Sequence, residues 1–333
     1  MSRTFILIFA AFLSNGVANS QEKKYSFSET KMGSPFNIIL VAGDSLKASS
    51  LAKQCYALVD SFNHVFSDYD STSELNRLNA SSGNNFFKPS AALWDIILLS
   101  QQAYQKSKGA FDITIGPLSR FWRKARKEKI FPDNNAVLEK RKLTGFNRLQ
   151  IDARARTLYL PIKGMRLDLG GIAKGYIAQQ VVDFLSRQGI NQALADAGGD
   201  MAMSKSPPNS KGWIIGINIP ETTDQLLAHK LLLASIAVAT SGDVYQYFEH
   251  NGKKYSHIID PRTGYGITSQ RNVTVIAKNG TDADWLATAC SILPVVSAKK
   301  LAEANHAELL ITELKDGKII YYTTKNFAHY WKQ

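Results

Sequence analysis

The chain has 333 residues, of which 44% are hydrophobic and 20% are charged. A chain of this length can bury a large core, and its composition excludes disorder for the bulk of it. The formal net charge is +12, and much of the excess lies in the basic segment 123–143. We interpret that segment as a solvated helical hairpin, with a surface for anionic lipid or an acidic partner as the alternative. Nucleic acid is not an expected partner, because aromatic residues are not interleaved with the basic ones.

A secretory signal is predicted at residues 1–20, and a single domain at 21–333. The N-terminus has a basic residue, the apolar run 5–13 and then small residues before Gln21. That order is typical of a cleaved signal, and the run is too short for a lasting membrane anchor. We therefore expect an exported, periplasmic protein that is soluble after cleavage.

The first elements of the mature chain are predicted to be two strands and then helices. Residues 24–41 alternate as a strand pair with a glycine-containing turn. Apolar residues at three- and four-residue spacing predict a helix over 45–66 and another over 90–108. The polar string 67–79 between them predicts a further helix start, capped by a serine.

Asp112 interrupts an apolar run at 109–122. An acid in such a run is costly to bury unless it is paired or bound to something. A turn residue satisfied by hydrogen bonds is one interpretation, and a ligand contact is the other.

The segment 165–200 predicts a strand, a helix and a second strand. Residues 166–169 alternate as a short strand, and a glycine pair ends them before the helix. The small side chains of 193–197 predict an inner strand that ends at the glycine turn 198–200. A glycine turn before a helix suits phosphate, but neither a Rossmann nor a Walker spacing is present, so a turn without a ligand is the alternative.

The C-terminal part predicts mainly strands. These are expected at 213–220, 231–239, 245–255 as a hairpin about an Asn-Gly turn, 272–277, 307–310 and 318–323, with a helix from 281 onward. No repeat or linker divides the chain, so we expect one α+β domain of mixed β-sheets packed with helices. Cys55 and Cys290 lie in apolar helical runs, which leaves both a disulfide and buried free thiols open.

Asp284 and Thr288 are four residues apart in the last predicted helix. Their oxygens therefore lie on one side of it, near its N-terminus. Hard oxygen ligands of this kind suit Mg²⁺. A capping box formed by Thr281 and Asp284 is the alternative.

Seven motifs occur in order along the chain: MGSPF, DYDSTSELNRLN, GAFDITIGPL, LDLGGIAKGY, ADAGGD, SHIIDPRTG and DADWLATA. Together they resemble the ApbE family of exported flavin transferases, and the match covers nearly all of the mature chain. The resemblance implies an enzyme that splits FAD at its pyrophosphate with Mg²⁺. FMN is joined through its phosphate to a Thr or Ser hydroxyl of a target protein, and AMP is released.

The resemblance also implies the residues of the site. The metal would be held by Asp284, Thr288 and the backbone carbonyl of Gly171. His257 or Asp260 is the candidate base for the target hydroxyl, with a purely structural histidine as the alternative. The positions that match the FAD site of the family are Met32, Tyr69, Ala110, Phe111, Asp112, Asp168 and Lys174.

Two other functions stay open at this point. Water in place of the target hydroxyl would make the protein an FAD pyrophosphatase that yields FMN and AMP. A periplasmic flavin-binding protein without turnover would not need the Asp284 and Thr288 pair, which argues against it. The target is not named by the sequence: a subunit of a membrane redox pump, which would bring the enzyme near the membrane, and an exported flavoprotein are both open.

Overall fold

The computed structural model describes residues 22–218, 227–242, 247–315 and 318–332. The predicted signal at 1–20 lies outside the described residues, so its cleavage stays a prediction. Among the described residues, no helix combines the length and the apolar character needed to cross a membrane.

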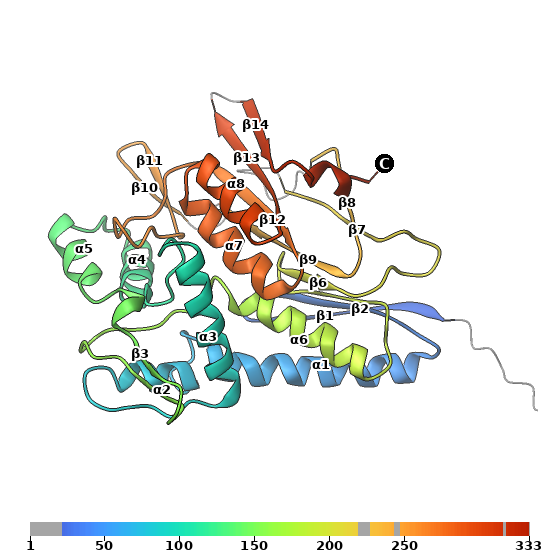
Figure 1. Cartoon of the computed structure of the whole chain (residues 1–333), viewed down its shortest axis with the longest axis horizontal. Coiled ribbons are helices and arrows are strands. Elements are labelled where there is room, and N and C mark those ends of the chain that lie inside the picture. Colours follow the sequence, from blue (N-terminus) through green and yellow to red (C-terminus); the bar gives the residue numbers. More distant parts are fainter. Residues whose placement is uncertain (1–21, 219–226, 243–246, 316–317, 333) are drawn as a thin grey trace, which may run out of the picture.

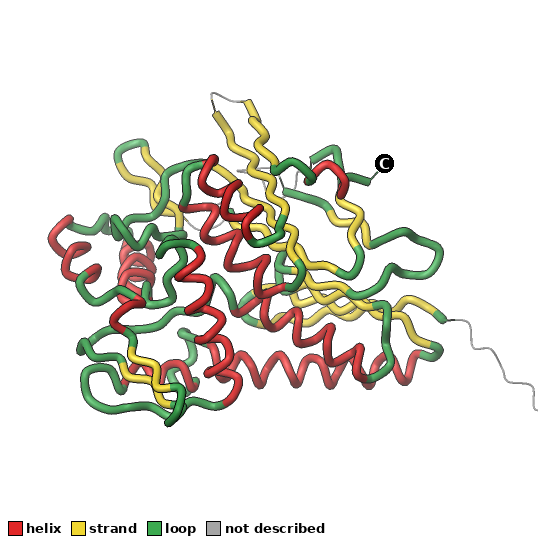
Figure 2. The backbone as a smooth tube through the Cα atoms, viewed as in Figure 1, coloured by secondary structure: helices red, strands yellow, loops and turns green. Residues whose placement is uncertain are grey.

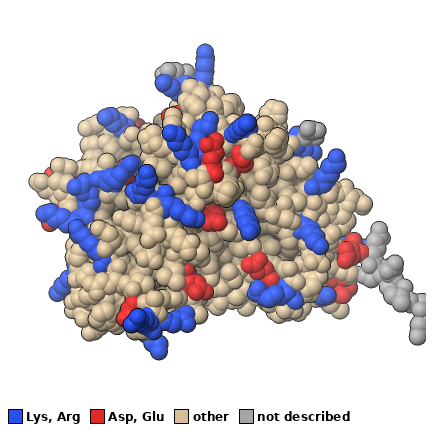
Figure 3. Space-filling model, viewed as in Figure 1, with Lys and Arg blue, Asp and Glu red and all other residues tan. Residues whose placement is uncertain are grey.

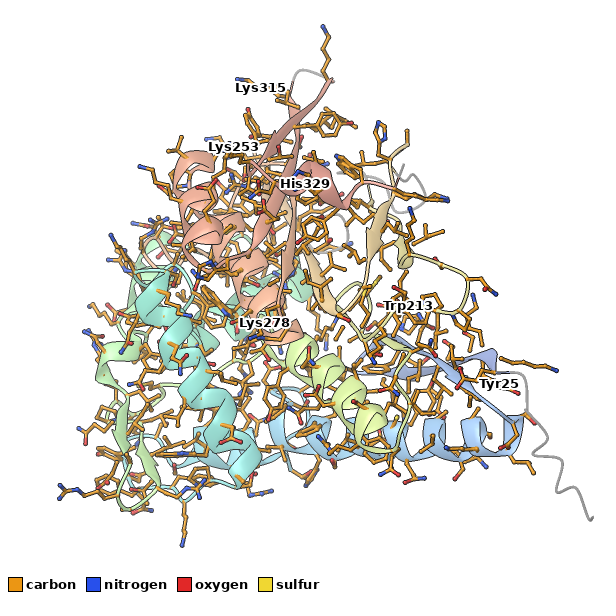
Figure 4. All side chains as sticks on the ribbon, turned by 45° about the vertical axis from the view of Figure 1, so that its right-hand side comes forward. Tyr25, Trp213, Lys253, Lys278, Lys315 and His329 are labelled. Carbon is orange, nitrogen blue, oxygen red and sulfur yellow. The ribbon has the colours of Figure 1, made fainter. Side chains whose placement is uncertain are left out.

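The centre of the fold is one eight-stranded sheet in the order β1-β2-β5-β6-β9-β12-β13-β14 (Figures 1 and 2). Every pair of neighbouring strands in it is antiparallel. Figure 4 shows Lys315 at the free end of the hairpin made by the last two strands, pointing away from the body. The strands are β1 (Lys23–Lys31), β2 (Ser34–Ala42), β5 (Ala193–Asp196), β6 (Met201–Met203), β9 (Ile236–Ser241), β12 (Arg271–Ala277), β13 (Glu308–Lys315) and β14 (Lys318–Thr323).

Helices cover one face of this sheet. They are α1 (Ser45–Phe66), α6 (Ala173–Arg187), α7 (Gly280–Ile292) and α8 (Val295–Ala304). Alternate residues of β2, such as Phe36, Ile38 and Leu40, are fully buried beneath them. Strand alternation thus supplies one wall of the main core, and the apolar faces of the helices supply the other.

The opposite face of the sheet is covered by a smaller layer. Its elements are β7 (Trp213–Ile215), β8 (Leu231–Leu233) and η2 (Phe327–Tyr330). Val238, Ile276 and Leu310 of the sheet form a second apolar cluster with Trp213 and Phe327 of this layer. Apolar side chains therefore cover both faces of the sheet at its centre.

A third group of elements packs beside the sheet, in green and cyan at the left of Figure 1. The elements are α2 (Glu74–Ala80), α3 (Ala91–Lys106), α4 (Gly116–Glu128), α5 (Asn134–Arg141), η1 (Phe146–Arg148), β3 (Gln150–Asp152) and β4 (Thr157–Tyr159). The hairpin of β10 (Tyr247–His250) and β11 (Lys253–Ser256) reaches them from the C-terminal half. The basic segment 123–143 belongs to α4 and α5, which pack together as the predicted helical hairpin.

The sequence predictions hold for most elements, including α1, the first hairpin and the Asn-Gly turn. The predicted strand at 166–169 is wrong: only one β-bridge forms, between Ile115 and Arg166. It cannot extend, because α4 begins at the next residue, Gly116. Without that strand no parallel crossover unit exists at 165–200, so the sheet is antiparallel and not mixed. The predicted strand at 231–239 is broken into β8 and β9, at Ser235 with its φ of 54°.

The two cysteines are both buried and free. Burial raises the pKa of each thiol to about 12, so neither is ionised near neutral pH. They act as small apolar side chains in the core, and the disulfide alternative is excluded.

Candidate active site

The site is built where α6 and α7 touch without intervening side chains. A Cβ atom on Gly175 would lie 2.1 Å from the carbonyl oxygen of Gly280, and one on Gly280 would lie 2.2 Å from that of Gly175. Only glycine fits at such an approach. Figure 4 places Lys278, just before α7, where the start of this helix meets α6. The glycines at 175 and 280 therefore bring the N-terminal turns of both helices together.

Asp284 lies inside this junction, 5% exposed. Its Oδ2 accepts a hydrogen bond of 2.9 Å from the backbone N–H of Gly175, near the start of α6. The cap of α7 is a different residue, Asn279, whose side chain accepts from the N–H of Asp282. The capping box of Thr281 and Asp284 is therefore excluded, and the Asp284 carboxylate faces the other helix.

Thr288 and Gly171 complete the predicted metal set. A Cβ on Gly171 would meet the Thr288 Oγ1 at 2.9 Å, so the glycine turn lies directly against this hydroxyl. Within the described ranges, no cluster of three His, Cys, Asp or Glu side chains could hold a metal. A cation at this junction would therefore depend on one carboxylate, a hydroxyl and a carbonyl, which suits the sparse protein ligation of Mg²⁺. The residues present fit that ion.

Electrostatics link Asp284 to Lys174 and to Asp200, a residue that the sequence analysis did not assign to the site. Burial raises the pKa of Asp284 to about 7, while the Gly175 N–H and the Lys174 charge oppose the rise. Burial, followed by the charge of Asp284, holds the pKa of Asp200 well above its usual range. Two carboxyl groups thus share one ammonium group. The motif ADAGGD pointed to this turn, but not to the proximity of Asp200 to α7.

The turn that carries Met32 reaches the same place. Met32 has φ of 52° at the β1–β2 turn, and it packs against the main core. A Cβ on Gly198 would lie 2.6 Å from Oγ of Ser34, in that turn, and 3.6 Å from Nζ of Lys174. The structure therefore brings Met32, Lys174 and the turn 198–200 to one edge of the site.

Phe111 borders the glycine turn, whereas Asp112 points elsewhere. The ring of Phe111 lies 3.3 Å from where a Cβ of Gly171 would be, and Ala110 is buried beside it in the core. Asp112 accepts hydrogen bonds from the N–H and the hydroxyl of Thr114 and from the N–H of Phe146. Both of its oxygens are thus used within the chain, as expected for a turn residue. A role of Asp112 in contacting FAD stays a prediction.

Tyr69 lies in an open pocket of about 650 Å³ on the side of α4. The residue is 73% exposed, and the Arg123 guanidinium lies 4.0 Å from the centroid of its ring. Arg123 is held by Asp68 at 2.7 Å and by Asp168 at 3.7 Å. One face of the ring is thus covered by a cation, which is a favourable arrangement.

Asp168 joins this pocket to the glycine turn. Its Oδ2 accepts from the hydroxyl of Ser119 at 2.6 Å, on α4, and its Oδ1 accepts from the N–H of Gly170 at 2.9 Å. The carboxylate therefore fixes the turn at 170–171 relative to α4. Asp168 thus links Tyr69, on the side of α4, to Phe111 and the other predicted FAD residues at the glycine turn.

His257 and Asp260 lie in the turn after β11, which α4 holds in place. The indole N–H of Trp122 donates to the carbonyl of Gly264 at 2.8 Å, across the third apolar cluster. His257 is exposed. Asp260 accepts from the backbone and the guanidinium of Arg262, with the closest side-chain contact at 2.7 Å. The Asp260 carboxylate is thus paired with Arg262, and His257 is exposed in the same turn.

Comparisons with known proteins agree with the motifs. The model of the ApbE family matches residues 32–311. The FAD:protein FMN transferase of Vibrio cholerae is 29% identical over 330 residues, or 98% of each chain. That of Klebsiella pneumoniae is 31% identical over 266 residues, which cover 80% of this chain and 81% of the relative.

Solved structures share the fold. The flavin transferase ApbE of Vibrio cholerae matches with a TM-score of 0.83 at 28% identity, over 93% of this chain and 99% of that one. The ApbE protein of Thermotoga maritima also gives 0.83, at 26% identity, over 93% and 100% of the two chains. The α+β fold class is confirmed, and so is the resemblance seen in the motifs. The chain belongs to the ApbE family.

Proposed function

We propose that this chain is an enzyme that transfers FMN from FAD to a Thr or Ser hydroxyl of a target protein, with release of AMP. Membership of the ApbE family and curated relatives called FAD:protein FMN transferases support it. The observation that carries the proposal is the junction of α6 and α7, where the buried Asp284 carboxylate lies beside Lys174 and the glycine turn at Gly171 lies against the Thr288 hydroxyl.

The proposed chemistry is displacement at phosphorus, which depends mainly on positioning and charge neutralisation. Mg²⁺ bound by Asp284, Thr288 and Gly171 would supply counter-charge to the pyrophosphate. The chain itself contributes the ammonium group of Lys174. The hydrogen bond from the Gly175 N–H to Oδ2 holds the Asp284 carboxylate in one orientation. The direction of its other oxygen, Oδ1, is therefore fixed as well.

We also propose His257 in preference to Asp260 as the base that takes the proton of the target hydroxyl. His257 is exposed, whereas Asp260 is only partly exposed and its carboxylate is held by Arg262. A base must reach a hydroxyl on a large partner, so exposure favours His257. The ring of Tyr69 beside α4 and the ring of Phe111 at the glycine turn offer surfaces for the ring systems of FAD.

The test uses the mature protein with FAD, Mg²⁺ and a candidate target protein. Flavin retained on the target after denaturation, together with AMP, would support the proposal. FMN and AMP without retained flavin would instead indicate a pyrophosphatase, and FAD left intact would indicate a binding protein. The Asp284→Ala variant is the control, because it keeps the predicted FAD contacts and removes the only charged ligand proposed for the cation.

Export to the periplasm remains part of the proposal. It rests on the order of residues at 1–20. The intact mass of protein recovered from the periplasm tests it: a chain that begins near Gln21 is expected, and one that retains 5–13 would contradict it.

A further inference from the structure

A stripe of three basic side chains runs along one side of α4. We define the basic stripe as Arg120, Lys124 and Lys127, which lie at positions i, i+4 and i+7 and are all exposed. That spacing places them on one face of the helix. All three line the pocket that contains Tyr69, and Arg123 of the same helix and Arg166 of the facing loop bring the cations in its lining to five. The stripe thus forms one wall of a hollow and is not scattered over the surface.

The charge of the stripe is largely uncompensated. Arg123, the cation between the stripe and Tyr69, already has Asp68 as its partner at 2.7 Å. Among the described residues, Lys124 pairs only with the exposed Glu128 at 3.7 Å, and a pair of this kind contributes little. Arg120 and Lys127 have no ion pair or side-chain hydrogen bond with any described residue. The pocket therefore has a positive field at its wall.

Figure 3 agrees with this distribution. Lys and Arg side chains outnumber acidic ones on the left side of the view, where α5 packs against α4.

The face of α4 opposite the stripe packs against the turn that carries His257, the proposed base. Trp122 and Leu118 of that face are buried, and Trp122 holds the turn of His257 through the carbonyl of Gly264. Arg166 lies five residues before Gly171, a separation that spans at most about 17 Å of extended chain. A partner bound along the stripe would therefore lie on the helix that organises both halves of the site.

We infer that the basic stripe docks an acidic segment of the protein that accepts the flavin, next to the hydroxyl that is modified. The inference rests on the proposed transfer to a protein. The shape of the surface favours a chain segment over a lipid bilayer, because the cations surround a hollow of about 650 Å³ that a flat bilayer would not fill. Docking of this kind selects the target by charge and raises the rate of encounter.

A binding experiment without FAD tests the docking separately from the chemistry. The probe is a short fluorescein-labelled peptide with one central Thr between Asp residues, and its twin has Asn in place of every Asp. Fluorescence anisotropy should show tighter binding of the acidic peptide, by on the order of tenfold at low salt, as expected for about three exposed ion pairs. The preference should disappear in the variant Arg120→Gln, Lys124→Gln, Lys127→Gln.

A matched variant controls for net charge. Lys53→Gln, Lys205→Gln, Lys300→Gln removes three exposed lysines that lie on α1, after β6 and on α8. This variant should keep the preference for the acidic peptide, and its melting temperature should match that of the stripe variant. Equal loss in both variants, or equal binding of the two peptides to the wild type, would overturn the inference.

Two further outcomes would separate protein docking from lipid binding and from flavin transfer. If vesicles of phosphatidylglycerol retain the wild type but not the stripe variant, while the two peptides bind alike, the stripe serves lipid and the inference fails. If the acidic peptide binds selectively through the stripe but no target ever retains flavin, the docking stands and the proposed transfer fails.

Discussion

Replacing Asp284 with Asn should stabilise the protein at alkaline pH when divalent cations are absent. Burial raises the pKa of this carboxyl from its ordinary value of 3.8 to about 7. The folded protein therefore holds the proton more tightly than the unfolded chain does. Between these two values the unfolded state is ionised while the folded state stays protonated, so the free energy of unfolding falls as pH rises.

The size of the effect follows from the shift. About three pKa units correspond to about 4 kcal/mol. This is an upper bound, because the new amide must find an acceptor near Asp200 while its oxygen keeps the bond from Gly175. At roughly 2.1 cal/mol/K of unfolding entropy per residue, about 4 kcal/mol raises the melting temperature of a chain of this length by about 6 °C.

Thermal unfolding of Asp284→Asn and wild type in EDTA measures this. The variant should melt higher at about pH 8, and the difference should become small at about pH 4, where the folded wild type is protonated and the unfolded chain, with its carboxyl pKa of 3.8, is only about half ionised. Added Mg²⁺ should then stabilise the wild type at about pH 8, but not the variant. A variant that melts below the wild type at both pH values, or equal stabilisation of both proteins by Mg²⁺, would refute the reasoning.

Three other substitutions test separate parts of the site. His257→Ala should lower the single-turnover rate of flavin transfer by about 10²–10⁴-fold with little change in FAD affinity, since a base acts on the target hydroxyl; lost affinity with an unchanged rate would contradict this. Gly175→Ala places a Cβ 2.1 Å from the carbonyl of Gly280, so denaturant unfolding should show a loss of about 1–3 kcal/mol or more; a silent substitution would refute the close helix contact. Arg123→Gln leaves Asp68, whose pKa burial already raises, without its cation. Its stability loss in urea should therefore be larger at about pH 8 than at about pH 4, and a loss independent of pH would argue against the ion pair.

The sequence predicted best what depends on local periodicity and ordered motifs. The regular apolar spacing of 45–66 predicted α1 with its observed bounds. The spacing of Asp284 and Thr288 placed both on one side of α7, because a helical period fixes neighbours four apart. Motif resemblance identified the family, although the roles assigned to single residues stay predictions.

Features that depend on contacts distant in sequence could not be predicted in this way. Residues 166–169 alternate as a strand does, but their backbone bonds to the short stretch before α4 and to the side chain of Asn79, so only one bridge forms among the described residues. Asp200 joins the site only because β5 and β6 bring its turn beside α7. Asn279 caps α7, which begins at Gly280, one residue before the predicted start at 281.

The junction of α6 and α7 also explains why a buried acid is tolerated. Asp284 and Asp200 together carry two negative charges when ionised, against the single positive charge of Lys174. The remaining charge can be neutralised by a proton or by a bound cation, and burial makes one of the two necessary. A bound cation would therefore compete with the proton for the same carboxylate. The glycines at 175 and 280 contribute to this burial, because their close approach brings α6 and α7 together around Asp284, which is 5% exposed.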